Sequence, residues 1–271
     1  MRAPSAILAA LAALSVATDA ASLRAAGNGT NVNPEIVGGV EAAVGKHLYL
    51  AGLRETAAGS TFCGGALIAP KYVLTAGHCI ETDAFTANYV ALGTHFASGS
   101  ADGERIRVTR RIVHPDYVSV EGTPFNDWAI LELETAAKTK PIKVKFDDNA
   151  VGTVATVRGW GSTRSGGSGS NVLKEVSVKI WDNAKCDKAI QQTSQGAAQH
   201  VTDTMVCAGG VRGQDSCQGD SGGPFTVKGA NGEDVITGVV SWGYGCALQN
   251  TPGVYARLSK AQDFISPYLS A

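Results

Sequence analysis

Gly219-Asp220-Ser221-Gly222-Gly223-Pro224 is the stretch on which the interpretation of this chain depends, because it places one serine among glycines. Glycine adopts backbone angles that other residues resist, and it leaves room for another chain to approach closely. A serine hydroxyl in such a turn can stand beside free backbone N–H groups, which an attacking oxygen requires. A glycine-rich turn without any chemistry has the same short pattern, so the rest of the sequence must separate the two interpretations.

The composition limits the classes of protein that need to be considered. The chain has 271 residues, of which 44% are hydrophobic and 17% are charged, and its formal net charge is −1. Its length allows a large core in one or two domains. The near-neutral charge gives no reason to expect nucleic acid or an anionic membrane as a partner. None of the cysteines forms a Cys-x-x-Cys pair, which argues against zinc and leaves many disulfide pairings open.

The N-terminal residues 1–20 are typical of a secretory signal peptide. Arg2 supplies a positive start, and residues 6–17 form an apolar run that is too short to span a bilayer. Cleavage is expected after Ala20. The alternative is a buried N-terminal helix. The signal-peptide interpretation predicts a secreted, extracellular protein.

Residues 21–35 are polar and are interpreted as a propeptide. They contain the sequon Asn28-Gly29-Thr30, so Asn28 is a candidate glycosylation site. The sequence Ile36-Val37-Gly38-Gly39 follows, and residues 36–271 are taken as the mature domain.

Short apolar runs separated by Gly, Ser or Pro predict β-strands from residue 48 onward. A first group lies at residues 48–54, 61–68, 73–76, 89–92, 106–113 and 128–133, and a second at 153–159, 173–180, 224–227, 235–242 and 253–258. A helical period is found only at residues 182–190, with Asp182 as N-cap, and at the C-terminus. There Ser259-Lys260-Ala261-Gln262 has the pattern of a capping box, and Pro267 predicts a short or kinked helix. The pattern predicts an all-β fold with two sheets or barrels.

A serine nucleophile needs a base, and the base needs an orienting group. His78 ends the apolar run Leu74-Thr75-Ala76-Gly77-His78-Cys79, whereas the other four histidines lie in turns or polar settings that predict surface positions. Asp127 precedes a buried strand in Asn126-Asp127-Trp128-Ala129-Ile130, where an unpartnered carboxylate would be costly. Taken singly, His78 is equally well a core histidine and Asp127 a turn or helix-cap residue.

Together these motifs resemble the chymotrypsin-like serine proteases, and the trypsins most of all. The matching blocks are Cys63-Gly64-Gly65, Thr75-Ala76-Gly77-His78-Cys79, Asn126-Asp127, Asp215-Ser216-Cys217-Gln218-Gly219-Asp220-Ser221-Gly222-Gly223-Pro224 and Ser241-Trp242-Gly243. The order His, Asp, Ser is that of this family and differs from subtilisins and α/β-hydrolases. The resemblance implies two antiparallel six-stranded β-barrels, at about residues 36–145 and 146–258, and a C-terminal helix at about 259–270.

The resemblance also implies the catalytic roles. Ser221 would attack the peptide carbonyl, His78 would accept and return its proton, and Asp127 would orient the imidazole. The backbone N–H groups of Gly219 and Ser221 would form the oxyanion hole.

The same resemblance implies a substrate pocket with an acidic base. Asp215 would select Arg or Lys, because an unpaired charge in a partly dry pocket is penalised. Gly243 and Gly253 would leave the pocket walls open for a long side chain. The expected substrate-binding residues are Asp215, Ser216, Ser241, Trp242, Gly243 and Gly253.

For the cysteines, the resemblance selects the pairs Cys63–Cys79, Cys186–Cys207 and Cys217–Cys246. In this family a newly released isoleucine ammonium pairs with the aspartate before the serine, which here implies Ile36 and Asp220. The residue before Ile36 is Glu35, so a trypsin-like enzyme would not readily activate itself. Another protease is expected to make that cut.

No cofactor and no required metal are expected. The calcium loop of animal trypsins is poorly matched, because Thr94 stands where a carboxylate is expected and Glu104 is left as the one plausible acid.

Two functions remain open. The favoured one is a secreted, monomeric endopeptidase that cuts after Arg or Lys in protein or peptide substrates and is open to protein inhibitors. The alternative is a serine-protease homologue that binds or inhibits another secreted protein, because the chain is also similar to oomycete glucanase inhibitors. Phrases such as Phe62-Cys63-Gly64-Gly65 and Ser241-Trp242-Gly243-Tyr244-Gly245-Cys246 carry that likeness. Such homologues typically lose triad residues, whereas this chain keeps all three. A non-enzymatic adhesive β-protein is a third interpretation.

Overall fold

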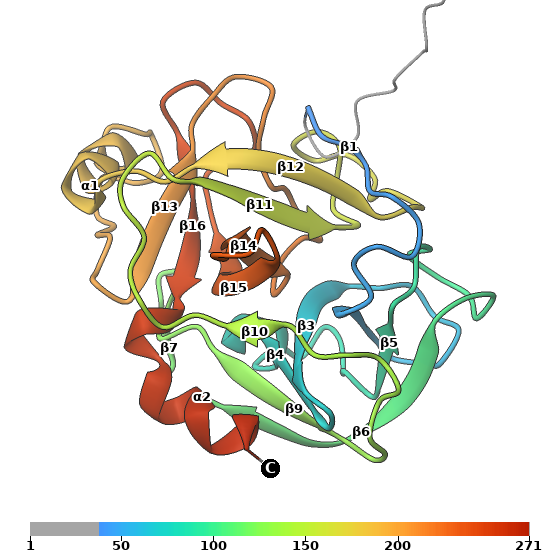
Figure 1. Ribbon diagram of the computed structural model, residues 1–271. Coiled ribbons are helices and arrows are strands. Elements are labelled where there is room, and N and C mark those ends of the chain that lie inside the picture. Colours follow the sequence, from blue (N-terminus) through green and yellow to red (C-terminus); the bar gives the residue numbers. More distant parts are fainter. Residues whose placement is uncertain (1–37, 271) are drawn as a thin grey trace, which may run out of the picture. The chain divides into compact units, whose positions relative to one another are not determined.

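The computed structural model describes residues 38–270 (Figure 1). The predicted signal peptide, the propeptide, Asn28 and Ile36 lie outside the described residues. No helix among residues 38–270 is long and apolar enough to cross a membrane.

The first β-unit is a closed antiparallel barrel. Its strands follow one another in the order β2-β3-β4-β9-β6-β5. They are β2 (Leu50–Arg54), β3 (Cys63–Ala69), β4 (Tyr72–Thr75), β5 (Tyr89–Leu92), β6 (Glu104–Val113) and β9 (Ala129–Leu133). Closure leaves no free strand edge, because each of the six strands pairs with a neighbour on both sides.

The second β-unit has the strand order β1-β12-β11-β14-β15-β16-β13 (Figure 1). Isolated bridging between Ile180 and Ala208 and an N–H···O bond of 2.9 Å from Trp181 to Cys207 join β12 back to β13. The strands are β1 (Val40–Glu41), β11 (Val154–Gly159), β12 (Lys174–Lys179), β13 (Met205–Gly209), β14 (Pro224–Lys228), β15 (Asp234–Trp242) and β16 (Pro252–Arg257). The predicted all-β architecture is confirmed.

Four features of the β-structure differ from the sequence prediction. Val40–Glu41, which was expected in the first barrel, pairs instead with β12 of the second unit. β13 was not predicted, because its short run ends in glycines and lacks a clear alternation. The linker strand β10 (Lys143–Val144) pairs in parallel with β15. A small hairpin of β7 (Val118–Val120) and β8 (Thr123–Phe125) also escaped prediction.

The two units share apolar packing. Trp128, Leu74 and Ile130 are fully buried in the first core, and that core continues through Val239 of β15 to Ile265 near the C-terminus. The core of the second unit holds the stacked rings of Phe225 and Tyr255, whose centroids lie 4.2 Å apart. Burial of the first core against β15 fixes the position of one unit on the other.

The helices lie where they were expected, with one correction. α1 (Asn183–Gln191) begins after Asp182, whose side chain accepts the N–H of Lys185 at 3.0 Å, as the N-cap prediction requires. At the C-terminus, a 3₁₀ turn η2 (Leu258–Lys260) precedes the short helix α2 (Gln262–Leu269), which begins at Gln262. The predicted capping box is wrong, because the Ser259 hydroxyl lies in the 3₁₀ turn and donates to Asp148 at 2.6 Å.

All six cysteines form disulfides in the pairs that the resemblance implied. They are Cys63–Cys79, Cys186–Cys207 and Cys217–Cys246. A disulfide stabilises a fold mainly by restricting the unfolded chain, by about 2–4 kcal/mol for typical loops.

Replacing the Asp182 cap should destabilise the second unit. Asp182→Ala removes the acceptor of the Lys185 N–H, so we expect the free energy of unfolding to fall by about 1 kcal/mol in urea denaturation. Asp182→Asn keeps an oxygen acceptor and serves as the control. An equal loss in both variants would show that the hydrogen bond is not the cause.

Candidate active site

His78 is held in the 3₁₀ turn η1 (Gly77–Cys79) that follows β4. A Cβ atom on Gly77 would lie 2.7 Å from the Tyr117 ring, so the turn requires glycine there. The backbone N–H of His78 donates to Asp127 Oδ1 at 2.8 Å, and the ring Nδ1 lies 2.8 Å from Asp127 Oδ2. The Asp127 side chain is 2% exposed, whereas the His78 side chain is 27% exposed.

The carboxylate of Asp127 fixes the tautomer of the ring. An ionised carboxylate can only accept hydrogen bonds, so Nδ1 carries the proton and donates it to Oδ2. In the neutral ring, Nε2 is then left with a lone pair that can accept a proton. Nε2 lies 3.7 Å from Cys79 Sγ, so the Cys63–Cys79 disulfide lies beside the ring.

Asp127 accepts a third hydrogen bond, from the second β-unit. The Ser241 hydroxyl of β15 donates to Asp127 Oδ2 at 2.5 Å. Sequence reasoning assigned Ser241 to the substrate pocket and missed this contact, since the two residues are 114 positions apart in the chain.

Ser221 lies in a backbone turn that is built by glycines. Its carbonyl oxygen accepts the N–H of Gly64 at 2.7 Å, which joins the turn to β3. Gly219 and Gly222 have φ angles of 95° and 77°, which favour glycine. No described residue hydrogen-bonds the Ser221 hydroxyl, and in ligand-free sites such bonds are often long and shorten only with substrate bound.

The two backbone amides that were predicted as the oxyanion hole have no hydrogen-bond acceptor among the described residues. No described residue accepts a hydrogen bond from the N–H of Gly219 or of Ser221, although the neighbouring amides of Asp220 and Gly222 do have backbone acceptors. Free amide donors beside a serine hydroxyl are what a developing oxyanion needs.

A cavity of about 200 Å³ begins at Ser221 and ends at Asp215. A Cβ atom on Gly253 would lie 3.2 Å from Asp215 Oδ1, and one on Gly243 would lie 3.7 Å from the Cα of Gly253. These two glycines therefore keep the cavity open. The structure brings all the predicted pocket residues together in its lining: Asp215, Ser216, Ser241, Trp242, Gly243 and Gly253.

The carboxylate of Asp215 is buried, and only one of its two oxygens has a hydrogen-bond donor. Oδ2 accepts the N–H of Ala247 at 3.0 Å, but Oδ1 has no partner in the described structure. Burial raises the pKa of Asp215 to about 7, while backbone N–H groups of Ala247 and Ser216 act in the opposite direction. A buried carboxylate with one free oxygen is matched by a cationic ligand that brings hydrogen-bond donors.

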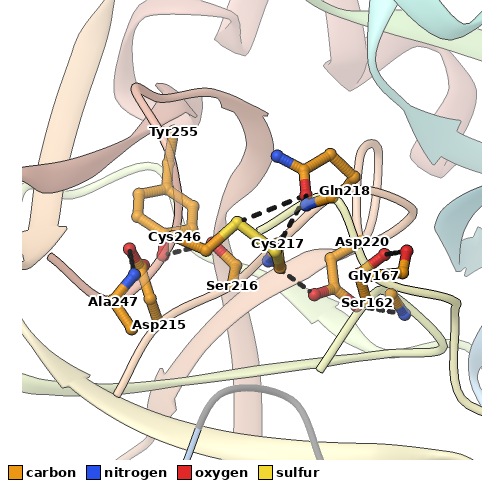
Figure 2. Close-up of a disulfide and its surroundings, with 12 residues drawn as sticks. Ser162, Gly167, Asp215, Ser216, Cys217, Gln218, Asp220, Cys246, Ala247 and Tyr255 are labelled. Atoms are coloured by element: carbon orange, nitrogen blue, oxygen red, sulfur yellow. Dashed lines mark hydrogen bonds between the residues drawn. A yellow bond between two sulfur atoms is a disulfide. The ribbon is translucent and has the colours of Figure 1, made fainter. Parts of the chain in front are cut away.

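Two positioning residues of this cavity were missed in the sequence. Ala247 has a φ of 57°, which is unusual for a side-chain-bearing residue and directs its N–H to Asp215. The hydroxyl of Tyr255 lies 3.1 Å from Ser216 Oγ. Figure 2 shows both residues beside Asp215. Neither contact has a local sequence signal, although Ala247 directly follows a pocket cysteine.

Gln218 lies against the Cys217–Cys246 disulfide at the rim of the cavity (Figure 2). Its Oε1 atom is 3.0 Å from Cys217 Sγ and 3.5 Å from Cys246 Sγ. Disulfide sulfurs carry no hydrogen, so these are contacts rather than hydrogen bonds. The disulfide joins the segment that carries Asp215 to the segment that carries Ala247.

Asp220 is completely buried next to the turn. Its carboxylate accepts N–H groups from Gly161 and Cys217, both at 2.9 Å, and burial raises its pKa to about 6. A side chain on Gly159 or Gly161 would collide with this carboxylate. The pairing of Asp220 with Ile36 stays a prediction, because Ile36 lies outside the described residues.

Two of the four remaining histidines are not on the surface as expected. His47 is 4% exposed and His95 is 6% exposed. His47 lies between Asp234 and Glu175, at 3.2 and 3.4 Å, and His95 lies 2.9 Å from Glu41. Their acidic partners lie in β1, β12 and β15, which polar sequence surroundings alone could not reveal.

Comparisons with known proteins show the family of this chain. The family described as Trypsin matches residues 36–265. The chain belongs to the trypsin family. Glucanase inhibitor protein 2 of Phytophthora sojae is 38% identical over 269 residues, which cover 97% of this chain and 88% of that protein. Trypsin 5G1 of Aedes aegypti is 38% identical over 245 residues, covering 88% and 86% of the two chains. Serine proteinase stubble of Drosophila melanogaster is 36% identical over 266 residues, covering 92% of this chain and 33% of that protein.

The loop at residues 94–105, where animal trypsins hold calcium, does not fit a metal here. Thr94 Oγ1 and the His95 N–H both donate to the carboxylate of Asp102 at 2.6 Å, an acid that sequence reasoning overlooked. The Gly99 carbonyl accepts guanidinium N–H groups from Arg54 at 2.7 Å and from Arg105 at 2.8 Å. The Asp102 carboxylate and the Gly99 carbonyl are therefore already bonded to donors, and two arginines supply the positive charge at Gly99.

Glu104, the acid expected to remain for calcium, is also engaged. Its carboxylate accepts the backbone N–H of Lys138 at 2.9 Å and the hydroxyl of Thr139 at 2.8 Å. Both donors belong to the segment that follows the first barrel, so Glu104 serves to fix that segment.

Binding of a cation in the Asp215 cavity should depend on pH. The small amidinium benzamidine should bind the ionised carboxylate, so affinity should be full above pH 7 and fall about tenfold per unit below it. Calorimetric titration between about pH 5 and 9 measures this dependence. Asp215→Asn is the control and should bind weakly at every pH. An affinity of the parent protein that stays constant across pH 7 would contradict the assignment.

Arg54 should act as the internal cation of the 94–105 loop. It is fully buried and also donates to the Phe96 carbonyl at 2.9 Å. Arg54→Met removes the charged donor of the Gly99 and Phe96 carbonyls, so we expect the free energy of unfolding to fall by about 1–3 kcal/mol. Arg110→Met, at an exposed position of the same barrel, should have almost no effect. A parent Tm that falls on addition of EDTA would show that a metal, rather than Arg54, holds the loop.

Proposed function

We propose that this protein is a secreted serine endopeptidase that hydrolyses peptide bonds after Arg or Lys. The observation that carries the proposal is the unpartnered Oδ1 of buried Asp215 at the end of a cavity that starts at Ser221. A substrate guanidinium or ammonium would supply the missing donors and charge. Its scissile carbonyl would then lie at the mouth of the cavity, beside the serine.

The proposed chemistry uses the groups already described. Ser221 Oγ forms a bond to the carbonyl carbon while its proton passes to His78 Nε2, and Asp127 stabilises the resulting imidazolium. The free N–H groups of Gly219 and Ser221 hold the oxyanion. His78 then gives the proton to the leaving amine, and water hydrolyses the acyl-enzyme by the reverse use of the same groups.

Activity is proposed to require release of Ile36 by another protease. Glu35 does not fit the Asp215 cavity, because a glutamate beside a buried carboxylate would be repelled. Removal of residues 1–35 would free the Ile36 ammonium to pair with Asp220. The three disulfides suit the oxidising environment of a secreted protein.

A second candidate function is binding and inhibition of another secreted protein, such as a glucanase, without cleavage. The comparisons favour this function over cleavage, because the glucanase inhibitor protein of Phytophthora sojae matches 97% of the chain. A pure binder would use the surface around the cleft and would not need turnover at Ser221.

Hydrolysis of a short Arg-amide peptide by protein that begins at Ile36 tests the first proposal. Turnover should be lost by a factor on the order of a million in Ser221→Ala, because the nucleophile is removed. A matched peptide with Glu in place of Arg should not be cleaved. Preference for a peptide with Phe in place of Arg would contradict the role of Asp215 but not the role of Ser221.

The same preparations separate the two functions. Folded protein that starts at Ile36, binds benzamidine and yet cleaves no Arg peptide would contradict the endopeptidase. Inhibition of a glucanase by that protein and equally by Ser221→Ala would establish the second function. Absence of inhibition would exclude the second function for that glucanase.

A further inference from the structure

A second cavity, of about 540 Å³, lies outside the catalytic site. It is formed by the segment before β2, by the linker that carries β10, and by the turn between β14 and β15. It shares no lining residue with the cavity that holds Asp215. We call it the basic groove. Its lining holds three lysines and two acids together with apolar side chains: Lys46, Lys140, Lys143, Glu233, Asp234, Leu48, Tyr49 and Pro141.

The floor of the basic groove is apolar and accessible. Leu48 is 44% exposed, although most leucines among residues 38–270 are buried. Tyr49 and Pro141 are partly exposed beside it, above the buried Ile142. An apolar side chain placed there would remove this surface from water, at about 25 cal/mol for each Å² that is buried.

The rim of the basic groove carries uncompensated positive charge. Lys143 pairs with Glu233 at 3.1 Å, and Asp234 pairs with Lys228 at 2.7 Å. No described acidic group pairs with Lys46 or Lys140, and both are exposed. The acids of the groove are thus neutralised within the protein, and two lysines are left to attract an acidic ligand.

The walls of the basic groove are fixed by contacts with both β-units. The Tyr49 hydroxyl lies 3.2 Å from Asp234 Oδ2 and 3.1 Å from Arg158 Nη1, so its ring cannot turn freely. The N–H of Ile142 donates to Leu67 of the first barrel at 2.9 Å. The N–H of Lys145 donates to Ile236 of the second unit, also at 2.9 Å. A ligand would therefore enter a preformed surface and lose little free energy in ordering it.

We propose that the basic groove is a docking site for a partner protein, through an exposed segment that carries a large apolar side chain flanked by Asp or Glu. The apolar side chain would cover Leu48, and the acidic groups would pair with Lys46 and Lys140. The N-terminal residues 1–37 of this chain do not match that description, because Asp19 and Glu35 are their only acidic residues and lie far apart. The proposal is independent of cleavage at Ser221.

Direct binding of a defined probe tests the proposal. The probe is a fluorescein-labelled hexapeptide with two leucines between an Asp-Glu and a Glu-Asp pair, added to mature Ser221→Ala protein at low ionic strength. Anisotropy should show saturable binding that weakens as salt is added, because exposed charges are screened. The double variant Lys46→Glu with Lys140→Glu should bind at least about tenfold more weakly, a loss of about 1.4 kcal/mol.

Two matched controls separate the groove from general charge attraction. Lys185→Glu with Lys188→Glu reverses two exposed lysines of α1, outside the groove, and should leave affinity unchanged. A second peptide with serines in place of both leucines should bind the parent protein at least about tenfold more weakly, because it cannot cover the apolar floor. Circular dichroism checks that each variant is folded.

Several results would overturn the proposal. These are absence of saturable binding, an equal loss in the α1 double variant, or full affinity for the serine peptide. Displacement of the peptide by saturating benzamidine would place it in the Asp215 cavity instead. Sedimentation that shows a dimer of the parent, but not of the Lys46→Glu and Lys140→Glu variant, would identify the groove as an interface between two copies of this chain.

Discussion

The carboxylate of Asp127 is a polar connection between the two β-units at the candidate active site. It is buried, and a buried carboxylate is costly unless it is fully hydrogen-bonded. Two of its donors come from His78 in the first barrel and the third is Ser241 in β15 of the second unit. The position of the imidazole therefore depends on the register of both units. A shift of β15 by one residue would turn Ser241 to the opposite face of its sheet and leave Asp127 without its third donor.

Asp215 and Asp220 are close in sequence and both buried, but their carboxylates differ in their hydrogen bonds. Asp220 has a backbone donor for each oxygen, from Gly161 and Cys217, and is enclosed by glycines. Asp215 has the amide of Ala247 for one oxygen, while the other faces the cavity without a partner. Burial raises the pKa of both groups. Satisfied oxygens are expected of a structural carboxylate, whereas an open oxygen in a cavity is a feature of a binding site.

The sequence predicted those parts of the site whose residues lie in short motifs with a local requirement. The turn around Ser221 needs its glycines, and the run that ends at His78 has to bury its apolar side chains. The missed features depend on partners far away in the chain. Arg54 donates to carbonyls more than forty positions later in the chain, and Tyr255 contacts Ser216 from β16. Ser259 has the pattern of a cap, but a nearby Asp148 accepts its hydroxyl, and no local pattern encodes that competition.

The free-energy cost of keeping the Asp215 cavity open indicates that the cavity has a function. An unsatisfied buried oxygen costs about 1–3 kcal/mol, and Ala247 adds backbone strain in order to hold the other oxygen. A protein that only bound its partner through the outer surface would gain stability by filling the cavity or by neutralising Asp215. The basic groove, proposed as a docking site, has no lining residue in common with the Asp215 cavity. Binding to a secreted protein and recognition of a cationic side chain can therefore coexist on one fold, and the cavity is best explained by a ligand that completes the hydrogen bonds of Asp215.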